Sequence, residues 1–300
     1  MIMNEIASYI ESSANNTSLL EEKNFEARME VTDFLDFQVL GQLAAMQQQP
    51  AQAEQALLLQ HQAYHLKSAM EAIDAKLFQR LRADIRAAKY SGQAFKNLIN
   101  SYVKFNNDHN EYTEISAYDS LDVLINGLSN IPTMPVQTKN LEPEMITFYK
   151  TPARVVFELV EKVQFREEDV FFDIGAGLGQ VSILVNLLTG IKVRGVEFEP
   201  AFYNYAQECA AALQLSNVLF LNEDARNTDY STGTVFFMFT PFKGEILQAV
   251  LALLQQESLH RKIKLVTYGP CTPYVSLQPW LAFDNSGNDD IYRLTVFNSL

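Results

Sequence analysis

Two acidic residues and three glycines stand close together in the middle of the chain. Asp173 ends an apolar run, Gly175, Gly177 and Gly179 follow it at alternate positions, and Glu197 ends the next apolar run. Glycines allow a sharp turn and bring bare backbone close to a ligand, and the start of a following helix offers free N–H groups. A carboxylate after the second strand can accept hydrogen bonds from both hydroxyls of a ribose. The stretch therefore predicts a nucleoside-binding turn between two parallel strands.

The spacing of the glycines distinguishes two classes of nucleotide cofactor. A dinucleotide fingerprint, G-x-G-x-x-G, requires a glycine at position 180, where this chain has Gln180. The observed pattern is G-x-G-x-G, and it resembles the first motif of class I S-adenosylmethionine-dependent methyltransferases. That resemblance implies that the glycine turn surrounds the methionine and ribose parts of S-adenosyl-L-methionine. It also implies that Asp173 holds the α-amino group of this cofactor.

Strand and helix patterns alternate on both sides of the glycine turn. Short apolar segments at 169–174, 191–197, 217–221, 234–239 and 263–268 predict strands, and helical patterns lie between most of them. Such alternation predicts a parallel sheet, and two final β segments, at 280–284 and 291–298, predict a closing hairpin with its turn at 285–288. The fold class is therefore α/β. The resemblance implies a Rossmann-like sheet of seven strands in the order 3-2-1-4-5-7-6.

Further candidate cofactor ligands follow the second and third predicted strands, because ligands of open parallel sheets lie beyond the carboxyl ends of the strands. Phe198 can lie against an adenine ring. Asp224 and Ala225 follow the third strand. The resemblance implies that the Asp224 carboxylate accepts from the adenine amino group and that the next backbone N–H reaches the ring.

Candidates for the acceptor side follow the later strands. Thr240 and Phe242 lie in the segment Phe-Thr-Pro-Phe, at a position where amino-methylating families often have Asn-Pro-Pro-Tyr. Phe239 stands where that asparagine would be, so the acceptor atom is not defined. Tyr149 and Tyr268 are the polar aromatic residues expected to border the acceptor, where either can orient a nucleophile.

A narrower resemblance is carried by residues on both sides of a helix that the sequence predicts from Pro152 to about Val163. Asp-Ile-Gly-Ala-Gly-Leu-Gly-Gln, which ends at Gln180, is similar to Asp-Leu-Gly-Ser-Gly-Val-Gly-Gln of the histone-lysine methyltransferases of the disruptor-of-telomeric-silencing type. Tyr149 and Thr151 are similar to the first and last residues of that family's Tyr-Gly-Glu-Thr loop, without its Gly-Glu pair. The resemblance covers about residues 145–245, and it implies that Tyr149, Thr151 and Gln180 also bind the cofactor.

The first part of the chain is helical in pattern. Helices are expected over 20–49, from Pro50 to about Ala88, and over 93–105. Apolar residues of the second recur every three or four positions, which favours a helical domain packing on itself or on the catalytic core. A coiled-coil interface that forms a homodimer is the alternative. We expect a helical domain over 1–130, a linker or cofactor-lid loop over 131–150, and the methyltransferase domain over 151–300.

Composition limits the compartment and the partners. The formal net charge is −13, so phosphate backbones are repelled on average and nucleic acid is disfavoured as a substrate. The start of the chain lacks the pattern of a signal peptide, and no apolar run is long enough to span a bilayer. The two cysteines have no metal spacing, and His61 and His65 have no third ligand in view, so no metal is expected. These features predict a cytoplasmic protein without a membrane partner.

Three functions remain open. The first is an S-adenosylmethionine-dependent methyltransferase that acts on an unidentified protein side chain or small molecule. The second is a non-catalytic module that binds the same cofactor and uses its helical domain for partner binding or dimerisation. A nicotinamide enzyme is third, because Gln180 occupies the position that a dinucleotide fingerprint gives to glycine.

Overall fold

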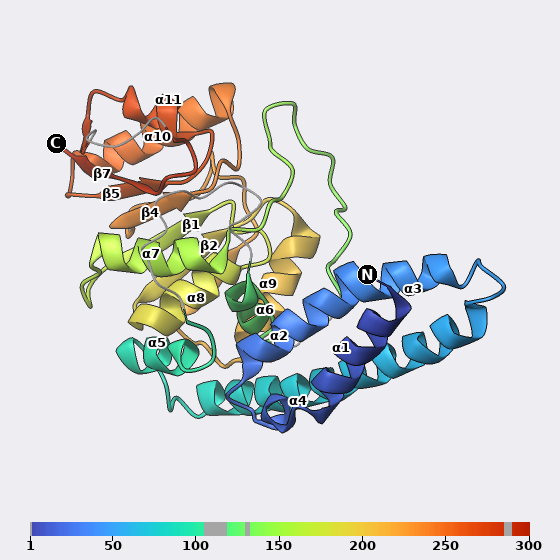
Figure 1. Cartoon of the computed structure of the whole chain (residues 1–300). Helices are drawn as coiled ribbons and strands as arrows, with labels where there is room; N and C mark the ends of the chain where they lie inside the picture. Colours follow the sequence, from blue (N-terminus) through green and yellow to red (C-terminus); the bar gives the residue numbers. More distant parts are fainter. Residues whose placement is uncertain (1, 105–118, 130–132, 285–289) are drawn as a thin grey trace. The chain divides into compact units, whose positions relative to one another are not determined.

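The computed structural model describes residues 2–104, 119–129, 133–284 and 290–300 (Figure 1). The chain divides into two compact units. A helical unit comprises Met1–Ala83 and Leu98–Lys104, and a sheet unit comprises Asp84–Asn97 and Phe105–Leu300. The expected domain limits at residues 130 and 150 stay a prediction. The expected turn at 285–288 lies outside the described residues.

The helical unit is built from consecutive helices. They are α1 Met3–Asn15, the 3₁₀ helix η1 Thr17–Leu20, α2 Phe25–Phe34, the π-helical segment η2 Leu35–Leu40, α3 Gly41–Met46, and α4 Ala53–Arg86, whose last residues belong to the sheet unit. The single helix expected over 20–49 is thus divided into several pieces. Its π-helical part keeps both Leu35 and Val39 buried.

The apolar stripe of α4 is at least partly covered within its own unit. Leu59, Ala63 and Met70 are buried and belong to one core with Ile6 and Leu35. A buried ion pair joins α2 to α4, since an Arg28 guanidinium nitrogen lies 2.7 Å from an Asp74 carboxylate oxygen. This packing agrees with a helical domain that folds on itself. A homodimer through these helices stays a prediction.

The sheet unit has seven strands in the order β3-β2-β1-β4-β5-β7-β6. The strands are β1 Val170–Ile174, β2 Lys192–Val196, β3 Val218–Leu221, β4 Val235–Met238, β5 Lys264–Thr267, β6 Leu281–Phe283 and β7 Thr295–Ser299. Strands β1 to β5 pair in parallel, and β7 pairs antiparallel with both β5 and β6. The labels of Figure 1 follow this order from β7 through β5, β4 and β1 to β2. The predicted fold class and strand order are confirmed.

The sheet unit has helices before its first strand and between most of the later ones. They are α5 Gln93–Asn100, whose last residues belong to the helical unit, α6 Ser120–Asn126, α7 Ala153–Val163, α8 Gln180–Thr189, α9 Pro200–Ala212, α10 Gly244–Ser258 and α11 Thr272–Ser276. Helix α11 was not expected. Its first two residues, Thr272 and Pro273, belong to the segment 268–273, whose glycine and two prolines are typical of a loop. No helix among the described residues is long and apolar enough to cross a membrane.

Side chains of the central strands alternate between two apolar layers. Phe172 of β1 and Phe236 of β4 stack with ring centroids 5.5 Å apart, in the same core as the apolar face of α10. Phe171 and Phe237 stack with centroids 6.4 Å apart. Asp173, which shares the face of Phe171, is hydrogen-bonded to α8. The sheet is therefore covered on both faces, and its polar residues collect at the carboxyl ends of the parallel strands.

Candidate functional site

The glycine turn after β1 is held against the end of β2. Both Gly175 and Ala176 donate their backbone N–H groups to the Val196 carbonyl, at 2.9 Å each. Gly177 has a φ of +53°, and a Cβ there would lie 2.3 Å from the Phe148 ring. Only glycine allows this conformation together with this close approach. The fold itself therefore requires glycine at position 177, whether or not a ligand is bound.

Glu197 ties the glycine turn to the loop after β2. Its Oε2 accepts the Gly177 N–H at 2.7 Å, and its Oε1 accepts the Glu199 N–H at 2.8 Å. The side chain is 8% exposed and lines a cavity. Burial raises the pKa of the Glu197 carboxyl, although its backbone hydrogen bonds oppose that rise. The carboxylate is thus fixed at the edge of the cavity, where its free lone pairs can accept from ligand hydroxyls.

Asp173 lies beneath the glycine turn and is 2% exposed. Its Oδ2 accepts from the backbone N–H of Ser182 at 3.1 Å and from the Ser182 hydroxyl at 2.8 Å. Burial raises the pKa of Asp173 to about 7, against the opposing effect of these hydrogen bonds. The acid therefore anchors the first turn of α8, and its protonation is balanced near neutral pH.

The loops after β2 and β3 bring Phe198, Asp224 and Ala225 to the same cavity as Glu197. The Lys139 ammonium lies 4.0 Å from the centre of the Phe198 ring. Asp224 is paired with Arg226, with an N···O distance of 2.6 Å, and this contact lowers the pKa of the Asp224 carboxyl. Arg226 was not among the predicted residues. Its position two residues after Asp224 is, however, close enough in the sequence to have suggested this ion pair.

Residues 137–150, which we call the strap, run along the carboxyl ends of the strands. Glu142 pairs with Arg226 at 2.6 Å, the Lys139 N–H donates to Glu199 at 2.7 Å, and the Ile146 N–H donates to the Pro241 carbonyl at 3.0 Å. Glu199 also accepts from Thr138, and despite its burial the Glu199 pKa falls to about 2. The strap is therefore attached to the loops after β2, β3 and β4.

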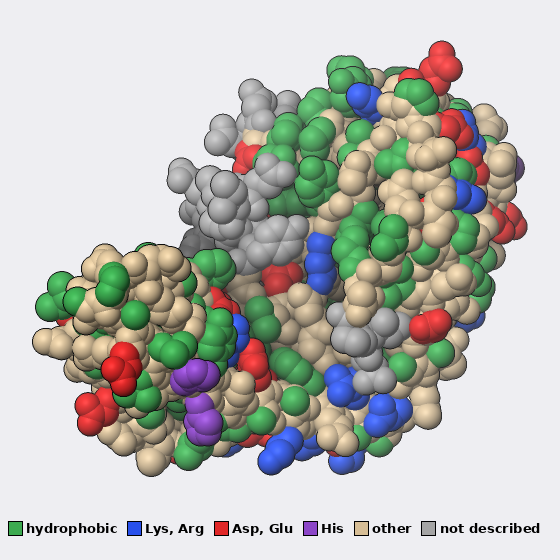
Figure 2. All heavy atoms as spheres, turned by 90° about the vertical axis from the view of Figure 1, so that its right-hand side faces the viewer, with side chains coloured by type: hydrophobic (Ala, Val, Ile, Leu, Met, Phe, Trp, Pro, Cys, Tyr) green, Lys and Arg blue, Asp and Glu red, His purple; other side chains and the backbone are tan. Residues whose placement is uncertain are grey.

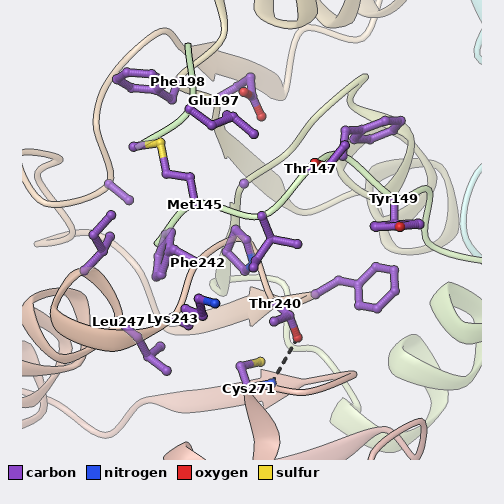
Figure 3. Close-up of a pocket in the computed structure, with 18 of the residues that line it drawn as sticks. Met145, Thr147, Tyr149, Glu197, Phe198, Thr240, Phe242, Lys243, Leu247 and Cys271 are labelled. Carbon is purple, nitrogen blue, oxygen red and sulfur yellow. Dashed lines mark hydrogen bonds between the residues drawn. The ribbon is translucent and has the colours of Figure 1, made fainter. Parts of the chain in front are cut away.

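The loops after β4 and β5 are joined by Thr240. Its hydroxyl donates to the Tyr268 carbonyl at 3.3 Å. It also accepts the Cys271 N–H at 3.0 Å, the contact drawn as a dashed line in Figure 3. Thr240 has a φ of +42°, a strained value for a residue with a branched side chain. Thr240 and Phe242 line the cavity, and the Thr240 hydroxyl is engaged by backbone groups, so the acceptor-side role expected for these two residues stays a prediction. Tyr268 is 2% exposed, packs on Phe239 with centroids 5.0 Å apart, and does not line the cavity.

Two cavities meet at the glycine turn. The first has a volume of about 370 Å³ and is lined by the carboxyl ends of β1 to β5 and by the strap. The second has a volume of about 530 Å³ and lies behind the turn, where Asp173, Gln180 and Thr151 line it. Phe148, Tyr149, Gly175 and Phe239 line both. The structure thus brings the predicted cofactor residues to one pair of adjoining cavities, except Gly177 and Gly179, which shape the turn without lining either.

Two predicted residues differ in how available they are to a ligand. Tyr149 is 64% exposed and stands at the cavity in Figure 3. Gln180 is the first residue of α8, and neither its amide nitrogen nor its amide oxygen has a hydrogen-bond partner in the described structure, although both atoms are buried. A buried amide without partners is costly, so it indicates a position prepared for a polar ligand.

Metal chemistry has no visible support. Among the described residues no group of three or more His, Cys, Asp or Glu side chains is arranged to hold a metal ion. His61 and His65 are both exposed on α4, and Figure 2 shows histidine side chains side by side at the surface. Cys271 lines the first cavity, where burial raises the pKa of its thiol and makes it a poor nucleophile.

The geometry of the site agrees with a family comparison. Residues 147–249, about a third of the chain, match the family model described as Histone methylation protein DOT1. The matched segment contains the glycine turn, Glu197 and the loops after β3 and β4. Together with the sheet order 3-2-1-4-5-7-6, this match identifies a class I methyltransferase domain and confirms the resemblance of its cofactor motif. The cofactor of this class is S-adenosyl-L-methionine.

No curated protein matches the chain. Similar solved structures include an RNA methyltransferase from Salinibacter ruber in complex with S-adenosyl-L-homocysteine, at 23% identity and a TM-score of 0.41, over 50% of this chain and 92% of that one. A precorrin-6y C5,15-methyltransferase from Geobacter metallireducens is 16% identical, with a TM-score of 0.37 over 49% and 87% of the two chains. A magnesium protoporphyrin IX methyltransferase from Synechocystis with bound S-adenosylmethionine is 17% identical, with a TM-score of 0.36 over 48% and 75%. These distant likenesses assign no acceptor to this chain.

Proposed function

We propose that this protein transfers a methyl group from S-adenosyl-L-methionine to an acceptor bound at the carboxyl ends of β4 and β5. The observation that carries the proposal is the position of Glu197. Its carboxylate is bonded to the Gly177 N–H at 2.7 Å and faces a cavity that Phe198, Asp224 and Ala225 also line. One cavity is therefore lined by a carboxylate that can accept hydrogen bonds from a ribose, an aromatic ring that can stack on adenine, and an acid that can bind the adenine amino group.

The residues present fit this cofactor. Gln180 offers a buried amide with no partner in the described structure, and the glycine turn leaves backbone exposed where a side chain would clash. Glu197 would hold the ribose, and Phe198 with Asp224 and Ala225 would hold the adenine. Thr151, Asp173 and Gln180 would hold the methionine part, in the second cavity. When bound, the cofactor supplies an electrophilic methyl group attached to a sulfonium.

The contribution of the protein to the transfer is positioning and exclusion of water. In-line displacement is fast when the acceptor is held on the axis of the reacting bond in a dry site. Phe239 and Phe242 provide apolar walls, and Tyr149 provides an exposed phenol that lines both cavities. None of the described residues that line the first cavity is a histidine, so an acceptor that is nucleophilic without a strong base suits the site best.

The acceptor is proposed to be a protein side chain or a small molecule. The net charge of −13 supports this proposal, because a polyanionic nucleic acid would be repelled on average. We also propose a cytoplasmic location, which the two free, buried cysteines support.

A second candidate is a module that binds the cofactor without transferring its methyl group. Two features of the β4 end favour it: Phe239 replaces the polar residue expected there, and the Thr240 hydroxyl is bonded to two backbone groups. Under this alternative the helical unit would serve partner binding or dimerisation.

Incubation with a cell lysate and cofactor carrying a labelled methyl group distinguishes the two candidates. The lysate is then separated into protein, nucleic acid and small-molecule fractions. Transfer that requires the intact protein and fails with Glu197→Ala supports the methyltransferase and identifies its acceptor class. Cofactor binding without transfer to any fraction would favour the binding module.

A further inference from the structure

Lys150 introduces a positive charge into the second cavity, behind the glycine turn. It is the single residue between Tyr149 and Thr151, and all three line that cavity. Its ammonium donates to the Asn126 side-chain oxygen, and Asn126 lines the same cavity. This half-buried cation therefore contributes to the lining of the second cavity. Sequence analysis did not select this residue, because no motif contains a lysine at this position.

Gln180 lines the same cavity at the start of α8. Its side-chain nitrogen and oxygen are buried without partners in the described structure, and it is the first residue of the helix, directly after the N-cap Gly179. The N-terminus of a ten-residue helix adds a partial positive charge at this end of the cavity. An amide donor, a helix N-terminus and an ammonium thus belong to one cavity wall.

Burial acts against the charged form of Lys150. Among the described residues, Asp122 opposes this effect; it is 4% exposed and also accepts the backbone N–H groups of Ala153 and Asp119, at 2.9 and 3.2 Å. Burial lowers the pKa of the Lys150 ammonium more than Asp122 raises it. A ligand carboxylate would offset the cost of burying this cation.

We propose that Lys150, together with the side-chain amide of Gln180, binds the α-carboxylate of the methionine part of the cofactor. This inference rests on the proposed function, because it places the amino-acid end of S-adenosylmethionine in the second cavity. It assigns a specific ligand group to a residue that departs from the Tyr-Gly-Glu-Thr loop of the resembled family. An ammonium forms charge-assisted hydrogen bonds with a carboxylate, so the contact contributes to both affinity and orientation.

Ligands that differ in this one group test the inference by calorimetry. S-adenosylhomocysteine carries the carboxylate, its decarboxylated analogue lacks only that group, and methylthioadenosine lacks the whole amino-acid part. Lys150→Met should weaken S-adenosylhomocysteine about 10- to 100-fold, the loss expected for one charge-assisted hydrogen bond. It should change the affinity for the decarboxylated analogue by less than about twofold, while Lys150→Arg retains most of the affinity for S-adenosylhomocysteine.

Lys192→Met is the matched control, because Lys192 is exposed at the opposite end of β2 and its loss changes the net charge equally. This control should leave all three affinities unchanged. Equal weakening of S-adenosylhomocysteine and its decarboxylated analogue by Lys150→Met would overturn the inference, and so would unchanged binding of S-adenosylhomocysteine. Failure of the wild-type protein to bind any of the three ligands would instead overturn the proposed function on which the inference depends.

Discussion

The protonation state of Asp173, next to the glycine turn, is expected to depend on pH near neutrality. The side chain is 2% exposed, and burial raises its pKa to about 7 even though Ser182 donates two hydrogen bonds to it. At neutral pH the unliganded protein therefore contains this acid in both protonation states. A ligand that brings an ammonium group to the turn would favour the ionised form.

We therefore expect the affinity for S-adenosylhomocysteine to rise with pH and to level off above about pH 7. Below that value the carboxyl is protonated, and binding of an ammonium group must release its proton, so affinity should fall by up to about tenfold for each pH unit. Calorimetry in buffers of different ionisation enthalpy measures both the affinity and the released proton. Asp173→Asn should bind more weakly and lose this pH dependence. A wild-type affinity that does not change between about pH 5.5 and 8 would contradict the assignment of Asp173.

Sequence alone selected several of the polar and aromatic residues at the cavities but not their partners. The alternate glycines and the acids at the ends of β1 and β2 follow from strand and turn patterns, which are local in the chain. The ion pair between Glu142 and Arg226 and the Thr240 hydroxyl between two loops depend on segments that meet only in the folded protein. Gln180 was assigned through a motif, whereas Lys150 stands where the motif has no equivalent.

At the scale of elements, the strap closes one side of the first cavity. Its ion pair between Glu142 and Arg226 is partly exposed, with side-chain exposures of 44% and 32%. Exposed pairs contribute only up to about 1 kcal/mol, so this contact can be opened by thermal motion. The hydrogen bonds of the strap to Glu199 and Pro241 give it further attachment points on either side.

Glu142→Gln should accelerate the release of S-adenosylhomocysteine by up to about fivefold, because it removes the charge attraction to Arg226 while keeping the side-chain shape. Stopped-flow fluorescence of ligand displacement measures this rate. Glu257→Gln is the control, since it breaks a comparable pair between Glu257, near the end of α10, and Arg261, neither of which lines a cavity. Equal release rates in the wild type and Glu142→Gln would show that the strap does not limit ligand exit.

The elements themselves were predicted well where local signals were strong. Helix α10 has the expected limits, and Gly190 ends α8 with a φ of +78°. Helix α11 and the π-helical segment η2 were missed. Both depend on packing that local propensity does not encode, since Val275 and Leu35 enter cores formed by distant segments. The strap was expected as a lid loop, but several of its partners, among them Glu199 and Ile246, lie 60 to 102 residues further along the chain.

At the scale of the whole molecule, an acidic protein carries a methyltransferase domain and a separate helical unit. The net charge of −13 favours cationic or neutral acceptors over nucleic acid. The buried core of the helical unit shows that α4 has partners within its own unit, so the unit does not require a second copy to bury this part of its stripe. A function in acceptor binding, partner binding or dimerisation stays a prediction.

Binding of S-adenosylhomocysteine, measured by calorimetry, tests the central claim most directly. We predict that the wild-type protein binds one equivalent per chain. Asp173→Ala combined with Glu197→Ala should lose about 1.5–3 kcal/mol of binding free energy for each carboxylate removed. Asp33→Ala combined with Glu208→Ala, which removes two exposed acids outside both cavities, should bind like the wild type. Absence of binding in the wild type, or undiminished binding in a folded Asp173→Ala and Glu197→Ala variant, would contradict this account.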